Sequence, residues 1–199
     1  MSFRSAIDSL IVIGLCAAVG YAQEEQEKID ESYRAFGVAM GPGMTGVLDI
    51  HISRWSTDEE RQALVESLIQ NGQEKTVDLL RKQKETGWTR TQAGRGMRGW
   101  PSVRLHYAYQ FSQPDGKRVV VLVTDRNIGM AEAVRSGRST EYEVSGIVME
   151  LQKGEDGKEK GQGTLFMAVK LNFDEEKKQL EIESLGVEPV RLTKIAREK

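Results

Sequence analysis

The alternation of apolar and polar residues predicts a chain built mainly of strands. Residues 47–55 read VLDIHISRW, and Leu48, Ile50 and Ile52 share one face of the expected strand. Asp49 and His51 fall on the opposite face, which is typical of a half-buried strand. The segment 103–111 alternates in the same way, and its expected apolar face holds Val103, Leu105, Tyr107, Tyr109 and Phe111.

The rest of the chain after Gly87 also favours strands. Residues 118–126 are apolar on both faces, which predicts a central strand. Two further strands are expected at 140–151 and 164–173, joined by a polar, mobile segment, and two shorter ones close the chain at 179–185 and 188–195. Because most of these joins are of hairpin length, the sheet is predicted to be mainly antiparallel.

Helical periodicity is clearest in the first part of the chain. Thr57 and Glu60 have the spacing of a capping box, and Asn71-Gly72 is a stop signal, so one helix is expected before Gly72. A second helix over 73–85 would complete a helical hairpin. Residues 23–36 carry Ile29, Tyr33 and Phe36 at helical spacing, and a Gly/Pro-rich stretch follows them.

These patterns predict an α+β fold in which the helical hairpin packs on a mainly antiparallel, curved sheet of about six or seven strands. The expected organisation is a signal peptide over 1–22, an N-terminal helix and linker over 23–45, and a single α+β domain over 46–199.

The first residues have the pattern of a signal peptide. Leu10 to Tyr21 is an apolar run, and its length of about a dozen residues falls short of the ~20 that a membrane-spanning helix needs. Gly20 and Ala22 are small residues at the positions that a signal peptidase reads, so cleavage is expected before Gln23. Export to the periplasm or the cell exterior follows, and the alternative is an uncleaved anchor. Cys16 is the only cysteine, so the mature chain is expected to be free of disulfides.

Charge is unevenly distributed although the net charge is only −2. Residues 86–138 carry nine basic and three acidic residues, a net of +6, whereas 23–85 carry eight and thirteen and 139–199 carry ten and thirteen. Mutual neutralisation in the fold is one interpretation, and a face that binds anions is the other.

Within the basic segment, residues 94–99 match the GxGxxG spacing of dinucleotide-binding turns. That turn requires a preceding buried strand and a following helix, and neither is expected here, so the sequence predicts a loop and no nucleotide cofactor. The loop can still hold an anion, and the candidate binding residues are Arg95, Arg98, Trp100 and Arg126. In the alternative interpretation the loop is solvated and Trp100 packs at a sheet edge.

Catalytic or metal-binding candidates are few. His51 shares a strand face with Asp49, and His106 lies on a second strand, so the three could hold a metal or form a base with an orienting carboxylate. Asp125 ends a buried strand, where it can either serve catalysis or cap a turn. Exposed strand histidines are common, and the sequence favours the absence of a metal, of a cofactor and of catalysis.

The leader and the segments RWSTDEERQALVESLIQNG, LHYAYQF, VVLVTDR and GQGTLFMAVKLNF resemble small exported proteins of bacteria. The resemblance implies export and supplies no activity or site residues.

The leading hypothesis is a non-catalytic binding or envelope-associated module. Its expected partner is an anionic lipid headgroup, a glycan or a small amphipathic ligand, with neither nucleic acid nor a transmembrane span in the mature chain. One alternative is a hydrolase or metal-assisted enzyme that uses His51 and His106 with Asp49 or Asp125. Another is a structural component of an envelope assembly.

Overall fold

The computed structural model describes residues 29–38, 45–92, 102–126, 128, 144–155, 157–174, 179–184 and 189–198. The predicted leader, most of the Gly/Pro-rich stretch, and the loop with Arg95, Arg98 and Trp100 lie outside these ranges.

The described residues form one helix and a ten-stranded antiparallel sheet. The elements are β1 (Glu31–Val38), β2 (Thr45–Ile52), α1 (Asp58–Lys82), β3 (Gly87–Gln92), β4 (Val103–Leu105), β5 (Tyr107–Ser112), β6 (Arg118–Thr124), β7 (Val144–Lys153), β8 (Glu159–Asp174), β9 (Gln179–Ser184) and β10 (Val190–Arg197). The strand order is β4-β3-β2-β1-β10-β8-β7-β6-β5, and β9 pairs with β8. β1 and β10, from opposite ends of the chain, are therefore neighbours in the sheet.

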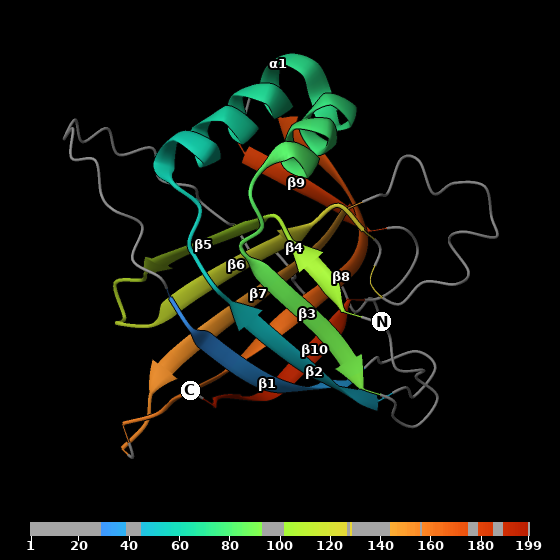
Figure 1. Ribbon diagram of the computed structural model, residues 1–199. Coiled ribbons are helices and arrows are strands. Elements are labelled where there is room, and N and C mark those ends of the chain that lie inside the picture. The colour runs from blue at the N-terminus through green and yellow to red at the C-terminus, as the bar shows by residue number, and fades with distance from the viewer. Residues whose placement is uncertain are drawn as a thin grey trace, which may run out of the picture.

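The sheet curves into a nearly closed barrel (Figure 1). Its two end strands, β4 and β5, are consecutive in the chain and are separated only by His106. Ser56 bridges to β5 at this seam: its amide donates to Ala108 O at 2.7 Å, and its hydroxyl accepts from the Ala108 amide at 3.1 Å. Part of the open edge of β5 is thus satisfied without a pairing strand.

Inward-facing apolar side chains fill the barrel. They alternate along the strands as period-2 patterning requires, and those at most 2 % exposed include Tyr33, Leu48, Ile50, Ile52, Leu105, Val120, Leu122, Ile147, Met149, Leu151, Leu192 and Ile195. The interior is therefore a packed core.

Helix α1 covers part of the outer surface of the barrel (Figure 1). Val77 packs with Val144 and Val169 in a second apolar cluster, which explains why strands of this region are apolar on both faces, as predicted for 118–126. The capping box of Thr57 and Glu60 is present. Within the described residues, no helix is long and apolar enough to cross a membrane.

The predicted antiparallel sheet is confirmed, but the predicted fold class is wrong in its helical hairpin and its number of strands. In place of a helical hairpin there is a single 25-residue helix, kinked at Gly72, where φ is 73° and ψ is −175°. The stop signal at Asn71-Gly72 therefore produces a kink, because helical geometry resumes directly after the glycine. The sheet has ten strands, against the six or seven expected.

The helix predicted over 23–36 is also wrong from Glu31 onward, because this segment is β1. Tyr33 and Phe36 have helical spacing, but the buried positions of the strand alternate through Glu31, Tyr33 and Ala35. Pairing with β2 on one side and β10 on the other decides the conformation, as tertiary context commonly does.

The predicted face of 103–111 changes at His106. The amide of His106 bonds to Val123 O, while Tyr107 is the register partner of Val123, so two residues oppose one as in a β-bulge. Leu105 and Ala108 consequently both face the core. Tyr107 and Tyr109 are only half-buried, and Arg61 of α1 lies over the Tyr109 ring.

The polar segment predicted to be mobile, 152–163, is mostly strand. β7 runs to Lys153 and β8 starts at Glu159, so only a tight turn separates them. The turn is closed by a hydrogen bond from the Gly154 amide to Lys158 O. This correction matters for function, since both strand ends contribute to the site below.

Candidate functional site

Charged side chains occupy the inward positions at one end of the barrel. Arg118 precedes the core residue Val120 by two positions on β6, and Glu31 precedes Tyr33 by two positions on β1. Lys153 likewise follows Leu151 on β7. Strand alternation therefore directs all three to the same side of the sheet, beyond the last layer of apolar residues. Glu31 is buried, Arg118 is half-buried and Lys153 is exposed. Glu159 of β8 and Arg197 of β10 complete the group.

Arg118, Arg197, Glu31 and Glu159 form a ring of ion pairs, which we call the charged ring. Arg118 Nη2 lies 3.0 Å from Glu31 Oε2 and 2.7 Å from Glu159 Oε2. Arg197 Nη2 lies 3.3 Å from Glu31 Oε1, and Arg197 Nη1 lies 3.3 Å from Glu159 Oε2. Each arginine therefore contacts both carboxylates, which is a network arrangement.

The hydroxyl of the core residue Tyr33 contacts the charged ring. Its hydroxyl lies 2.7 Å from Glu31 Oε2 and 3.2 Å from Glu159 Oε2, and it accepts a hydrogen bond from Arg118. Burial and the neighbouring Glu31 raise the pKa of Tyr33 above its ordinary value, so the hydroxyl stays protonated. Trp55 also lies beside the charged ring, with the Arg118 guanidinium 5.9 Å from its ring centre.

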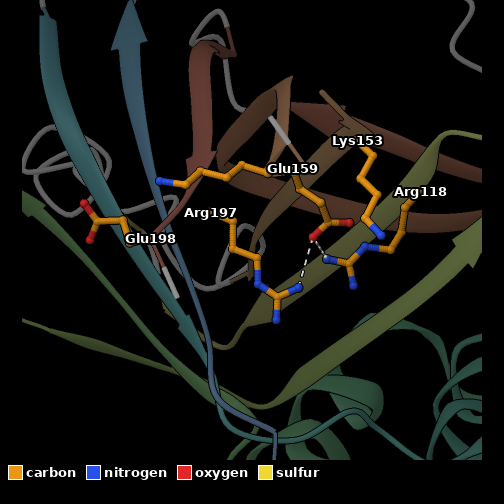
Figure 2. A pocket seen from close by; sticks show the side chains of 7 residues that line it. Arg118, Lys153, Glu159, Arg197 and Glu198 are labelled. Atoms are coloured by element: carbon orange, nitrogen blue, oxygen red, sulfur yellow. Dashed lines mark hydrogen bonds and ion pairs between the residues drawn. The ribbon is translucent and has the colours of Figure 1, made fainter. Parts of the chain in front are cut away.

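A hollow of about 440 Å³ opens on the charged ring (Figure 2). Its lining residues are Arg118, Lys153, Gly157, Lys158, Glu159, Arg197 and Glu198. Figure 2 shows the Glu159 carboxylate between the two guanidinium groups. Four of the seven lining residues are cationic and two are anionic, which gives the lining a net charge of +2.

The arginine at the centre of the charged ring is cationic under all ordinary conditions. Burial alone would lower the pKa of Arg118, but the hydrogen bond and charge of Glu31, with further contributions from Tyr33 and Glu159, raise it. The site consequently offers permanent positive charge and hydrogen-bond donors, the properties that bind carboxylates and other oxyanions.

Of the four anion-binding residues predicted from the sequence, only Arg126 is among the described residues. Arg95, Arg98 and Trp100 lie outside the described residues. Arg126 is exposed directly after β6 and does not line the hollow. Among the described residues of the basic segment 86–138, Arg118 is the one that lines the hollow.

The candidate catalytic residues fall into separate contacts. Asp49 binds Arg34, Arg90 and Gln92. His51 Nδ1 lies 3.2 Å from Ser32 Oγ, and the His51 ring stacks on Trp88. The Asp30 carboxylate lies near the same ring nitrogen, at 3.6 Å. In a catalytic triad the acid and the hydroxyl contact opposite ring nitrogens of the histidine, so Ser32, His51 and Asp30 do not form one.

The other candidate histidine, His106, lies near Asp125, the residue that directly follows β6. His106 Nε2 lies 3.6 Å from Asp125 Oδ1, and Nδ1 lies 3.3 Å from Gln83 O. Asp125 also receives a hydrogen bond from Arg81, so its carboxylate joins the helix to β6. Within the described ranges, no group of three or more His, Cys, Asp or Glu residues could hold a metal ion.

Sequence reasoning missed the charged ring, although one signal was available. Arg118 is in phase with Val120 and Leu122 on a strand that is apolar on both faces, so it had to point inward at the strand end. Glu31 is in phase with Tyr33 in the same way.

No family model, curated protein or solved structure matches this chain, so the comparisons assign neither a family nor an activity.

Proposed function

We propose that this protein is a non-catalytic binding module whose ligand is a small anion held in the hollow above the charged ring. The observation that carries the proposal is the set of four cationic side chains around one hollow, from Arg118, Lys153, Lys158 and Arg197. A hollow of about 440 Å³ lies within the ~300–1,000 Å³ range of small-molecule sites.

The balance of charge supports an anionic ligand. The lining carries +2, and Glu31 beneath it reduces the local charge to +1. Glu198 is held by Arg34, 2.8 Å away, so part of its charge is neutralised from outside the lining. The ammonium of Lys153 makes no hydrogen bond or ion pair with any residue of the described ranges, and the side chain extends toward the hollow (Figure 2).

Binding is favoured over catalysis by the chemistry of the lining. It consists of Arg, Lys, Glu and Gly residues, and Glu159, one of its two acids, is engaged by two arginines. A general acid or base needs a proton affinity near the working pH. Guanidinium groups stay protonated in proteins, so the arginines of the hollow are suited to holding charge rather than transferring protons.

The test is an NMR titration of the ¹⁵N-labelled chain with sodium citrate and sodium phosphate at low ionic strength. Amide shifts are expected at Lys153, Lys158 and Glu159, and they should weaken as NaCl is added because exposed charge interactions are screened. Lys153→Glu is expected to weaken citrate binding about tenfold, which is about 1.4 kcal/mol.

The matched control is Lys75→Glu, which makes the same charge change at an exposed helix position away from the hollow. It is expected to leave the affinity nearly unchanged. Absence of shifts at the hollow with millimolar anion at low salt, or equal losses in both variants, would contradict the proposal.

A further inference from the structure

We infer that Glu159 is a built-in competitor in this site, and that the ligand is a small polycarboxylate, one carboxylate of which replaces Glu159 between Arg118 and Arg197. This inference rests on the proposed function and specifies both its ligand class and its regulation.

Glu159 already occupies the place of a bound carboxylate. Its Oε2 atom lies 2.7 Å from Arg118 Nη2 and 3.3 Å from Arg197 Nη1, which are distances of charge-assisted hydrogen bonds and ion pairs. Its Oε1 atom makes no hydrogen bond within the described ranges. The carboxylate therefore contacts the two arginines through only one of its oxygens.

The two acids of the charged ring differ in how firmly they are held. Glu31 engages Arg118 and Arg197 with both oxygens. It also lies 2.7 Å from the Tyr33 hydroxyl, against 3.2 Å for Glu159. Glu159 lines the hollow, whereas Glu31 does not. Glu159 is therefore the acid that an incoming anion meets first, and Glu31 remains to balance the arginines beneath it.

The position of Glu159 in the fold also favours displacement. It is the first residue of β8 and pairs with Lys153, the last residue of β7, directly after the turn that joins the two strands. A side chain at a strand end can rotate toward solvent without disturbing packed core residues. Its carboxylate would then be hydrated, and the guanidinium nitrogens that now contact Glu159 would face a ligand.

The shape of the site indicates a ligand without an apolar tail. The described lining of the hollow consists of charged residues and a glycine. Beneath it, Tyr33, Leu151 and Ile195 are each about 1 % exposed, so the hollow presents no apolar surface to an alkyl chain. The hollow exceeds what one carboxylate fills, and Lys153 lies on its wall. A second carboxylate on a short polar body would reach this ammonium, which favours dicarboxylates and tricarboxylates over monocarboxylates.

The experiment compares the wild-type chain with Glu159→Gln and Glu198→Gln by isothermal titration with citrate, acetate, phosphate and dodecanoate. Both variants remove one negative charge from the lining, but Glu198 pairs with Arg34 and not with the central arginines. If Glu159 competes with the ligand, Glu159→Gln should tighten citrate binding about tenfold, and Glu198→Gln by about twofold or less.

The other outcomes separate this inference from the proposed function. Equal gains in both variants, or an unchanged affinity in Glu159→Gln, would overturn the competition while leaving anion binding in place. Acetate, phosphate or dodecanoate binding as tightly as citrate would overturn the ligand class. If no anion binds any of the three chains, the proposed function itself fails.

A second measurement uses the wild-type chain and does not depend on the stability of a variant. The side-chain carboxyl ¹³C resonance of Glu159 is expected to shift as citrate saturates the site, because the carboxylate leaves Arg118 and Arg197. The Glu31 carboxyl resonance should shift less. A Glu159 resonance that stays in place while amide shifts report saturation would overturn the displacement.

Discussion

The guanidinium of Arg54 binds the carboxylate of Glu60 with hydrogen bonds of 2.8 and 3.0 Å. The same guanidinium donates to Lys84 O at 2.6 Å and to Glu85 O at 3.2 Å, directly after the helix. One side chain between β2 and α1 thus contacts both ends of the helix, and at 6 % side-chain exposure it is almost entirely buried. We therefore expect the docking of α1 on the barrel to depend on this contact.

We predict that Arg54→Lys lowers the free energy of unfolding by about 3 kcal/mol, because a lysine cannot donate to all of these acceptors and leaves buried groups unpaired. Urea denaturation measures the loss. The control is Arg104→Lys, which alters an exposed pair with Glu85 and should cost less than about 1 kcal/mol. Similar losses in the two variants would show that α1 does not depend on Arg54.

Asp49 is expected to make part of the stability pH-dependent. Burial would raise the pKa of Asp49, but hydrogen bonds from Gln92, Arg90 and Arg34 outweigh it and lower the pKa below the ordinary range. A lowered folded pKa contributes stability above the unfolded value near 3.9, and this stability is lost as the pH falls through the folded value.

We predict that Asp49→Asn costs about 1 kcal/mol at pH 7, a modest value because both arginines are half exposed and screened by solvent. At a pH below the folded pKa of Asp49, the wild type should lose this advantage and the two chains should approach each other in stability. Denaturation midpoints at pH 7 and under acidic conditions measure the difference. A constant gap at both values would contradict the titration of Asp49.

Gly72 is predicted to be required for the kink in α1. Its φ of 73° and ψ of −175° lie in a region that only glycine occupies readily. Gly72→Ala should therefore lower the free energy of unfolding by about 1–3 kcal/mol, although alanine is the better helix former. The neighbouring exposed Asn71→Ala is the control. A neutral or stabilising Gly72→Ala would show that α1 can straighten.

Local signals in the sequence predicted local features of the fold. The alternation of Leu48, Ile50 and Ile52 gave the core face of β2, and all three are buried. The spacing of Thr57 and Glu60 predicted the capping box. Each of these features depends on residues within a few positions of one another, so propensity and periodicity suffice to find them.

The strand count and the helix predicted over 23–36 failed because long-range pairing decided them. Residues 31–38 pair with β10, more than a hundred positions away in the chain, and no periodicity of the segment itself reports that partner. The polar composition of residues 152–163 indicates a long loop, but strand pairing continues almost to the turn after Lys153.

The candidate site could be predicted only in part. Alternation places Arg118 and Glu31 inside the barrel, but it cannot show that they meet. Arg197 reaches the charged ring after an irregularity in β10 between Leu192 and Ile195, which shifts the alternation. Glu159 lies in the segment predicted to be a mobile loop. The ring is therefore a product of the topology, which brings β1, β6, β8 and β10 to one end of the barrel.

Export is predicted from the N-terminal residues alone. When the full chain is expressed in a bacterial host, we expect it in the periplasmic fraction or the medium with an N-terminus at Gln23, because Gly20 and Ala22 are the small residues a signal peptidase requires. N-terminal sequencing and intact mass measure this. Ala22→Arg should block cleavage and leave the leader attached. A wild-type chain that keeps residues 1–22 in the cytosol would contradict export, and a chain that begins at Cys16 would indicate lipid attachment instead.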